Sequence, residues 1–265
     1  MFMQRLITSL ILIPLVLLIL FYAPIWFLAG LVVLVILAST RECWQLIPIK
    51  SKPLQIIFSF LVLFSLWGCG ELFSYWQLLG LGVWVLIFIA ILTFPNSQRY
   101  WGYSVLVATV CCIVLPLFAQ SLIHLYFITQ GKSLLLYLLF IVWASDIGAY
   151  IAGKRFGSHK LIPRVSPGKS WEGALGGFIL AMMIAISGYF YFHPHSSLNW
   201  FVLAGCTVVI SIFGDLFISI LKRRSNIKDT GSLIPGHGGV LDRLDSLIAA
   251  LPWFYFGLTY IPLGF

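Results

Sequence analysis

Residues 104–127, SVLVATVCCIVLPLFAQSLIHLYF, contain no Asp, Glu, Lys or Arg. As a helix rising about 1.5 Å per residue, this run reaches about 36 Å, which exceeds the roughly 30 Å hydrocarbon core of a bilayer. Eight further apolar runs follow the same pattern and are separated by turn-forming or polar segments. The nine expected spans are 6–23, 25–43, 54–73, 78–94, 104–127, 133–153, 170–192, 200–221 and 242–261.

The composition of the whole chain also indicates a membrane protein. Of its 265 residues, 61% are hydrophobic and only 9% are charged, with a mean hydropathy of +1.03. A soluble domain of this size needs a larger polar surface. We therefore expect an all-α polytopic integral membrane protein with about nine transmembrane helices, forming a single transmembrane domain over residues 1–265. Residues 1–130 are expected to be mainly scaffold and lipid-facing spans, and residues 131–265 to supply the catalytic spans and cytoplasmic loops.

The basic residues predict the topology. Fifteen of the sixteen Lys and Arg residues fall at the N-terminus, in alternate loops, or at the span ends beside those loops, and only Lys132 falls on the other side. Under the positive-inside rule, this places the N-terminus in the cytoplasm and the C-terminus outside. The charged segments 154–169 and 219–245 are then both cytoplasmic.

Two aspartates lie in the interior of expected spans, away from the span ends. Asp146 and Asp215 are each seven or eight residues from a basic cluster, so both are expected roughly 10–12 Å inside the membrane. A charged Asp at the bilayer centre costs about 2.5–3.5 kcal/mol on insertion scales and usually faces a bundle interior or a water-filled cavity. Either carboxylate could simply pair with a lysine and hold two helices together, but their matched depth favours a functional site.

Charge is most concentrated in residues 219–245, which hold five basic residues and three aspartates. Asp242 and Asp245 are three residues apart and share one helix face. Compensation of the helix dipole, worth about 0.3–1 kcal/mol per residue, accounts for one of them. The preceding PGHGG at 235–239 permits close backbone approach to an anionic ligand, although such loops also occur at plain turns.

The cations of this segment have two interpretations. Lys222, Arg223 and Arg224 end a span, where basic residues commonly act as topological anchors or contact anionic lipids. Lys228 beside Asp229, together with glycine-backed carboxylates, instead indicates a phosphate substrate and a divalent metal such as Mg²⁺. His237 is expected to contact the ligand, with acid–base catalysis and a plain turn role as alternatives.

These motifs carry a family resemblance. SILKR at 219–223, KDTG at 228–231, PGHGG at 235–239 and DRLD at 242–245 together resemble the signature of the phosphatidate cytidylyltransferases, also called CDP-diacylglycerol synthases. The elements S-D-x-x-A-Y-x-x-G at 145–153 and S-P-x-K-S-x-E-G at 166–173 are also similar to that family. One position departs from the pattern, because Gly168 stands where the family usually has a second lysine.

The resemblance implies a reaction and a setting. Phosphatidic acid and CTP would give CDP-diacylglycerol and pyrophosphate, a step of phospholipid biosynthesis that requires Mg²⁺, and a second cation such as K⁺ is left open. The resemblance further implies a homodimer surrounded by membrane lipids. We expect it in the bacterial inner membrane with its active site facing the cytoplasm, and no feature indicates a nucleic-acid partner.

Roles follow from the resemblance position by position. Asp215 and Asp242 would ligate the metal, while Asp245 and Asp146 would support it or hold a second cation. Lys222, Lys228 and Arg243 would neutralise phosphates, with Lys169 contributing from the loop before 170–192 and Glu172 orienting it. The expected catalytic residues are Asp215, Asp242, Asp245, Lys222 and Lys228. The expected substrate-binding residues are Asp146, Lys169, Glu172, Arg223, Asp229, His237, Gly238, Gly239 and Arg243.

Two other functions are alternatives to this one. A CDP-alcohol phosphotransferase would carry a D-G-x-x-A-R element followed by spaced aspartates, which this sequence lacks. In a secondary transporter, Asp146 and Asp215 would relay protons or bind a cation at mid-membrane. The sequence shows no inverted repeat, and its charge lies near one face, so the transporter is disfavoured.

Overall fold

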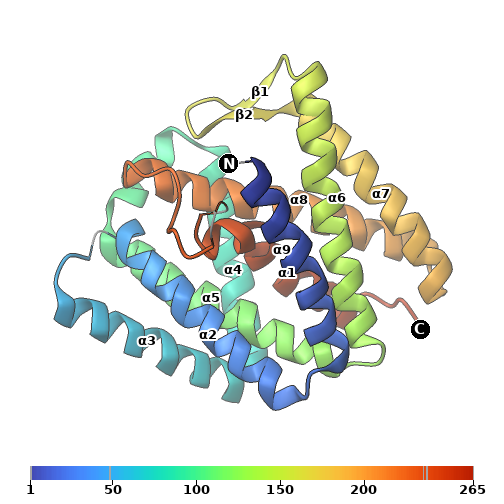
Figure 1. The fold of residues 1–265 in the computed structure, drawn as a ribbon, viewed down its shortest axis with the longest axis horizontal. Helices are drawn as coiled ribbons and strands as arrows, with labels where there is room; N and C mark the ends of the chain where they lie inside the picture. Colours follow the sequence, from blue (N-terminus) through green and yellow to red (C-terminus); the bar gives the residue numbers. More distant parts are fainter. Residues whose placement is uncertain (1, 48, 235, 237, 265) are drawn as a thin grey trace. The chain divides into compact units, whose positions relative to one another are not determined.

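The computed structural model describes residues 2–47, 49–234, 236 and 238–264, with side chains from residue 10 onward (Figure 1). Each expected span coincides with one helix of the described chain, which confirms the all-α fold class. The elements are α1 (Phe2–Tyr22), α2 (Ile25–Leu46), α3 (Lys52–Glu71), α4 (Phe73–Leu92), η1 (Asn96–Gly102), α5 (Ser104–Phe127), α6 (Gly131–Phe156), β1 (Lys160–Ile162), β2 (Ser166–Ser170), α7 (Trp171–Phe192), α8 (Ser197–Arg224) and α9 (Leu241–Tyr260).

The helices suit a membrane. Within the described residues, seven helices, α2 to α8, are long and apolar enough to cross a bilayer. Helix α1 contributes a shorter apolar stretch over its described side chains, Leu10–Tyr22. The protein is thus an integral membrane protein, whereas the total of nine spans and the cytoplasmic N-terminus stay predictions.

Helix ends differ from the apolar runs by a few residues. Helices α2 and α8 both continue three residues past the end of the expected span, to Leu46 and Arg224. Hydropathy falls before the backbone hydrogen bonding stops, because polar side chains at a membrane boundary remain compatible with a helix. As a result, Glu42 and Lys222 lie within regular helix, where their side chains have fixed directions.

The chain forms two compact units. One combines Met1–Ile123 with Ile220–Asp245, and the other combines His124–Ser219 with Ser246–Phe265. The charged segment after residue 219 therefore packs in the same unit as the first five helices. This grouping brings together residues that are nearly two hundred positions apart in the sequence.

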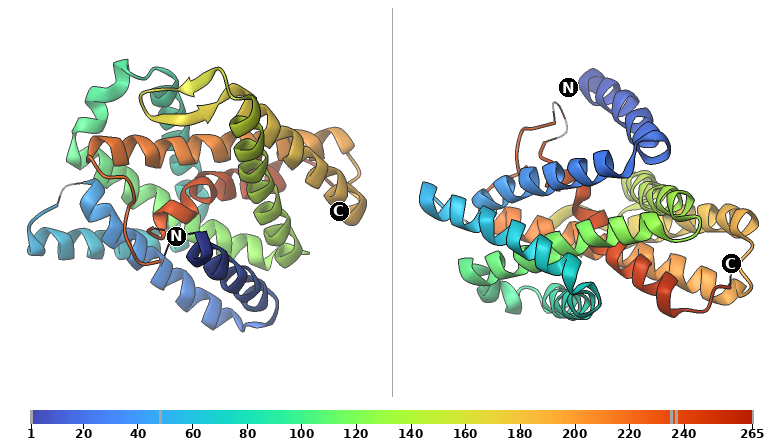
Figure 2. Two further views of the ribbon diagram at one scale, coloured as in Figure 1. Left: turned by 45° about the horizontal axis from the view of Figure 1, so that its top comes forward. Right: turned by 90° about the horizontal axis from the view of Figure 1, so that it is seen from below.

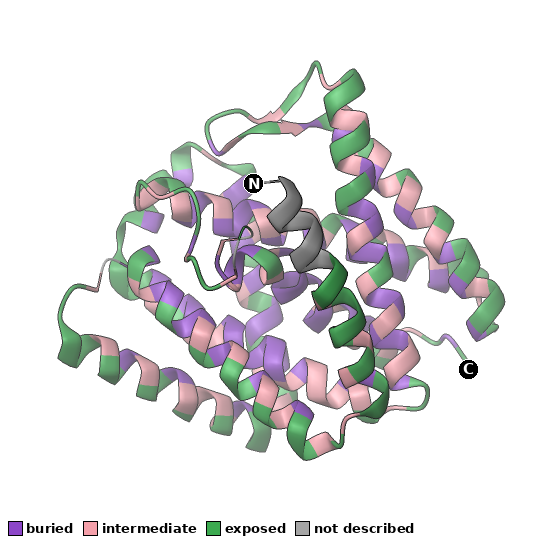
Figure 3. Ribbon diagram, in the orientation of Figure 1, coloured by how far each residue is buried: buried purple, intermediate pink, exposed green. Residues whose placement is uncertain are grey.

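In the first unit, α3 packs between its sequence neighbours α2 and α4. Buried side chains along α3 are few, namely Phe58, Val62 and Cys69, and most of its surface is exposed or intermediate (Figure 3). Gln120 Nε2 of α5 donates to the Leu66 carbonyl of α3 at 3.1 Å. An apolar helix with such an exposed surface suits contact with lipid.

In the second unit, α6 and α7 lie side by side along most of their length (Figures 1 and 2). Small residues permit this approach, because a Cβ added to Gly148 would lie only 2.6 Å from the Gly176 carbonyl oxygen. The indole of Trp200 stacks on Tyr137 with ring centroids 4.7 Å apart. Its Nε1 also donates to the Ala185 carbonyl at 2.8 Å, which ties α8 to α7.

A short hairpin joins α6 to α7, where the sequence analysis predicted only a basic loop. Strands β1 and β2 pair antiparallel, with Ile162 opposite Ser166. Strands this short carry no readable alternation, and Pro163 and Pro167 indicate a loop. The hairpin ends at Ser170, whose hydroxyl accepts from Gly173 N at 3.1 Å and caps α7.

Candidate active site

Among the described residues, each unit holds a cluster of polar groups that includes one of the aspartates expected to bind metal. The first, here called the α2 cluster, consists of Glu42, Lys222, Thr230, Gly239 and Asp242. The second, called the hairpin cluster, consists of Lys169, Asp215 and Ser219.

Asp242 is the most fully bonded carboxylate of the α2 cluster. Its Oδ1 lies 2.7 Å from Lys222 Nζ, and its side chain is only 4% exposed. Its Oδ2 accepts from Thr230 N at 2.7 Å and from Gly239 N at 3.0 Å, and it lies 3.0 Å from Thr230 Oγ1. A buried carboxylate is tolerated when it has such partners, and this one also faces the positive end of the α9 dipole.

Glu42 of α2 forms the other side of the same cluster. Its Oε1 accepts from Val240 N at 2.7 Å. Its Oε2 accepts from Leu241 N at 2.8 Å and from Thr230 Oγ1 at 2.7 Å. The sequence analysis gave Glu42 no role. The available signal was a carboxylate beside Arg41 at the end of an apolar run, where an unpartnered acid is costly.

The glycines of this loop make room for the protein's own carboxylates. A Cβ on Gly239 would overlap the side chains of Thr230 and Glu42. Gly238 has φ +84°, a conformation that favours glycine, and a Cβ there would lie 2.9 Å from Asp242 Oδ2. The sequence analysis interpreted these glycines as sites of close approach to a ligand. That role for Gly238 and Gly239 stays a prediction.

Arg224 at the end of α8 and Ser225 directly after it contact α2. Arg224 Nη2 donates to the Gly102 carbonyl at 2.8 Å, and Arg224 Nη1 approaches the Leu46 carbonyl at 3.4 Å. Ser225 Oγ donates to the same Leu46 carbonyl at 3.1 Å. A cation at a helix C-terminus is favourable because it meets free carbonyl groups and the negative end of the dipole. Arg224 thus joins α8 to the end of α2.

The hairpin cluster brings together two residues that the sequence analysis selected from distant segments. Lys169 Nζ of β2 lies 2.5 Å from Asp215 Oδ2 of α8, and Ser219 Oγ donates to Asp215 Oδ1 at 3.3 Å. Both charged side chains remain partly exposed, at 25% for Lys169 and 29% for Asp215. Partly exposed ion pairs contribute little net stability, so a ligand can compete for either partner.

Glu172 has partners other than the one expected for it. Its Oε1 accepts from Ser158 Oγ at 2.7 Å and lies 2.6 Å from His159 Nδ1, and His159 N donates to the same carboxylate. The sequence analysis expected Glu172 to orient Lys169. Instead, Glu172 hydrogen-bonds to Ser158 and His159 at the start of the hairpin. These bonds join the start of the hairpin to the start of α7, directly after the strand that carries Lys169.

The remaining selected residues mostly face outward. Asp245 is partly exposed in the first turn after Asp242, and His237 lies outside the described residues. The exposed ones are Asp146, Arg223, Lys228, Asp229 and Arg243.

The side chains available as ligands limit how the expected metal can be bound. Within the described part of the chain, no three His, Cys, Asp or Glu side chains gather closely enough to hold a metal ion by themselves. Mg²⁺ at nucleotide sites commonly uses one or two carboxylates and completes its octahedron with substrate phosphates and waters. Asp215 in the second unit and Asp242 in the first each offer one carboxylate of the kind that this mode uses, and each carries a lysine ammonium on one oxygen in this structure.

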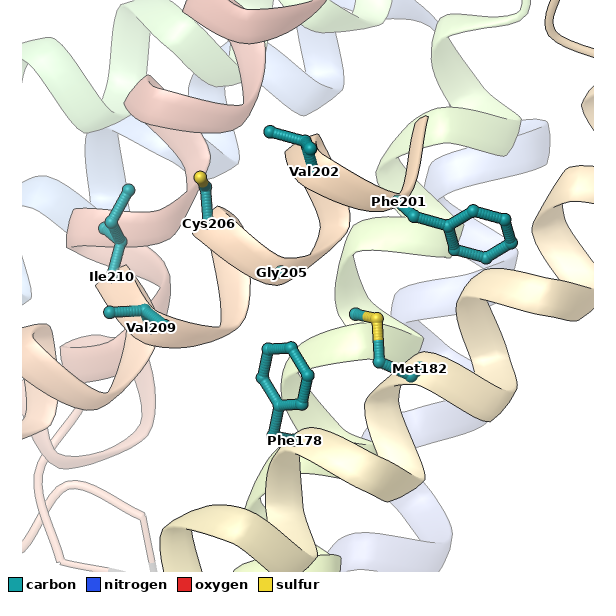
Figure 4. A pocket seen from close by; sticks show the side chains of 8 residues that line it. All are labelled: Phe178, Met182, Phe201, Val202, Gly205, Cys206, Val209 and Ile210. Atoms are coloured by element: carbon teal, nitrogen blue, oxygen red, sulfur yellow. The ribbon is translucent and has the colours of Figure 1, made fainter. Parts of the chain in front are cut away.

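An apolar groove lies in the second unit between α7 and α8 (Figure 4). Its volume is about 570 Å³. Because the lining carries no charged side chain, the groove cannot neutralise a triphosphate, and the chemistry has to be sought at the two polar clusters. The lining residues are Phe178 and Met182 of α7 with Phe201, Val202, Gly205, Cys206, Val209 and Ile210 of α8.

Comparisons with known proteins cover nearly the whole chain. Residues 3–261 match the model of a family described as the cytidylyltransferase family. A phosphatidate cytidylyltransferase of Haemophilus influenzae is 36% identical over 97% of this chain and 99% of its own length. One of Pseudomonas aeruginosa is 38% identical over 95% of this chain and 94% of its own. One of Staphylococcus aureus is 40% identical over 47% of this chain and 48% of its own.

Proposed function

The chain belongs to the cytidylyltransferase family, and we propose that it is a phosphatidate cytidylyltransferase, which transfers CMP from CTP to phosphatidic acid. The observation that carries this function is the near end-to-end match with two relatives of that name. The polar clusters supply suitable chemistry, because both pair carboxylates with lysines in a chain whose other surfaces are largely apolar.

The reaction joins two anions. A phosphate oxygen of phosphatidic acid forms a bond to the α-phosphorus of CTP, the bond from that phosphorus to its bridging oxygen breaks, and pyrophosphate leaves. Catalysis of this kind depends on positioning and on neutralising charge. Lys222, Lys228, Arg243 and Lys169 are the cations proposed for the phosphates. Lys228 and Arg243 are exposed, which supports direct contact with a soluble nucleotide.

We assign the metal to the carboxylates. Asp215 and Asp242 are the proposed ligands of Mg²⁺, and Asp245 and Asp146 are proposed to support it or to hold a second cation such as K⁺. When bound, Mg²⁺ would supply positive charge to the phosphoryl oxygens. Lys169 and Lys222 now neutralise the two ligand carboxylates, so these ammonium groups would become available to phosphate once another cation takes that place.

Other side chains are proposed to bind substrate around these clusters. Glu172 is proposed to act indirectly, because its hydrogen bonds join the two ends of the hairpin that carries Lys169. Direct contacts are proposed for Arg223, Asp229, His237, Gly238 and Gly239.

The setting is proposed from the charge distribution. Basic residues accumulate on one side of the expected topology, which supports the bacterial inner membrane with the site facing the cytoplasm. An amphiphilic acceptor can then stay in the cytoplasmic leaflet while its phosphate meets CTP. We also propose a homodimer surrounded by membrane lipids.

The test is direct turnover. Purified protein, supplied with labelled CTP, phosphatidic acid and Mg²⁺, is expected to release pyrophosphate and form CDP-diacylglycerol in equal amounts. Omission of phosphatidic acid serves as the control for CTP hydrolysis. Absence of both products from folded protein, or uptake into proteoliposomes without pyrophosphate release, would overturn the assignment and favour a transporter.

A further inference from the structure

The last turns of α2 hold the charged segment that follows α8 at both of its ends. Near its start, Ser225 Oγ and Arg224 Nη1 reach the Leu46 carbonyl. Near its other end, Val240 N and Leu241 N reach Glu42, one turn earlier on α2. The loop between α8 and α9, which carries Lys228 and is flanked by Lys222 and Asp242, is therefore held at both ends by a single stretch of one helix.

Glu42 acts as a helix cap supplied from another helix. The first N–H groups of a helix have no partner within it, and Leu241 is the first residue of α9. A carboxylate at this position accepts those hydrogen bonds and complements the positive end of the helix dipole. Glu42 is 6% exposed, so water cannot readily replace it as the acceptor.

Thr230 connects this cap to the proposed catalytic groups. Its hydroxyl lies 2.7 Å from Glu42 Oε2 and 3.0 Å from Asp242 Oδ2, while its backbone N–H donates to Asp242 at 2.7 Å. On the far oxygen of Asp242 lies Lys222 Nζ. A continuous chain of contacts thus runs from Glu42 through Thr230 and Asp242 to Lys222.

From these contacts we infer that Glu42 is a positioning residue for nucleotidyl transfer. Its carboxylate fixes the start of α9 and the loop at Thr230, which sets the direction of Asp242 and, through Asp242, the place of the Lys222 ammonium. This role rests on the proposed function, because that function is what places Asp242 and Lys222 in the chemistry. Misplacement of reacting groups by about 1 Å can lower a rate on the order of 100-fold, so the effect should fall on kcat.

The test compares Glu42→Gln and Glu42→Ala with Glu71→Gln, which changes an exposed acid at the end of α3 in the same unit. We expect both Glu42 variants to lower kcat at least about tenfold and to change KM for CTP less than about threefold. This pattern is the one expected when an interaction made only in the transition state is lost. Glu71→Gln should keep both constants. Hydrogen exchange should rise in peptides covering 229–242 and remain unchanged in peptides from α6 and α7.

Each result has a defined meaning. Normal kcat in a folded Glu42→Ala protein would overturn the inference, as would a rise of exchange spread evenly over all peptides, which would show only a general structural role. If Glu42→Ala does not fold, Thr230→Val removes the hydroxyl link while leaving the Glu42 cap, and it should still lower kcat. If the wild-type protein makes no product, the proposed function fails, yet the local exchange result still decides whether Glu42 holds the loop.

Discussion

Lys222 Nζ lies 2.7 Å from Asp242 Oδ1, and both side chains are largely enclosed, at 15% and 4% exposure. The pair joins the last turns of α8 to the first turn of α9. Removing one partner of such a pair leaves the other charge buried and uncompensated. The contact is therefore structural as well as part of the proposed catalytic site, and variants of its two residues will report on both properties.

Lys222→Met should destabilise the protein, whereas Lys228→Met should not. Loss of one partner of a buried pair costs about 3–5 kcal/mol, while Lys228 is exposed and lies in the same segment. Both variants should lose turnover. Thermal unfolding in detergent separates them, and equal unfolding temperatures would show that the Lys222–Asp242 pair contributes no stability.

Asp215→Asn should abolish product formation and leave the protein inserted and folded. Its pair with Lys169 is partly exposed, and exposed pairs are worth only about 0–1 kcal/mol. The measurements are pyrophosphate release and the elution profile on size exclusion. Near-normal turnover would exclude Asp215 from the metal site.

Gly239→Ala should be strongly destabilising and Gly168→Ala neutral. A Cβ at Gly239 would overlap Thr230 and Glu42, but at Gly168 it would meet no atom within 4 Å. Both substitutions add one methyl group, so the second serves as the matched control. If Gly239→Ala unfolds at the wild-type temperature, the loop can shift away from Glu42 without loss of stability.

Removal of divalent metal should stop the reaction reversibly. Chelation with EDTA is expected to abolish pyrophosphate release, and added Mg²⁺ should restore it, because only one or two carboxylates are proposed as ligands and the ion then exchanges readily. A separate titration with K⁺ in place of Na⁺ examines the second cation. Full activity in EDTA would remove Mg²⁺ from the mechanism.

The helices were predictable because their information is local. In lipid, the backbone N–H and C=O groups of each apolar run have to form their hydrogen bonds within the segment, which requires a helix. The runs therefore indicated α2 to α8 directly. The hairpin between α6 and α7 escaped prediction, because strands of three and five residues with two prolines look like a loop. Helix ends were misplaced by about one turn where polar residues continue the helix.

The site was predictable only in part, for a related reason. Lys169 and Asp215 were both selected from motifs, but their pairing is a product of the fold. Glu42 was overlooked because its partner Thr230 lies 188 residues further along the chain, and the local signal, an acid at the end of an apolar run, does not identify that partner. The glycines before Asp242 were selected from the sequence. Glycine is required both where a ligand approaches the backbone and where an internal carboxylate does, so the sequence does not distinguish these two roles.

The distance in sequence between Glu42 and its partners has a consequence for biosynthesis. Its acceptor oxygens are occupied by residues 188 to 199 positions later. At about 5–20 residues per second, the ribosome takes about 10–40 s to make them after α2 has been synthesised. During that time the newly made helix carries an unsatisfied acid, and the first unit is completed only when the start of α9 emerges. Chains truncated before residue 230 should therefore insert but fail to complete the first unit, and membrane proteases should degrade them faster than the full-length chain.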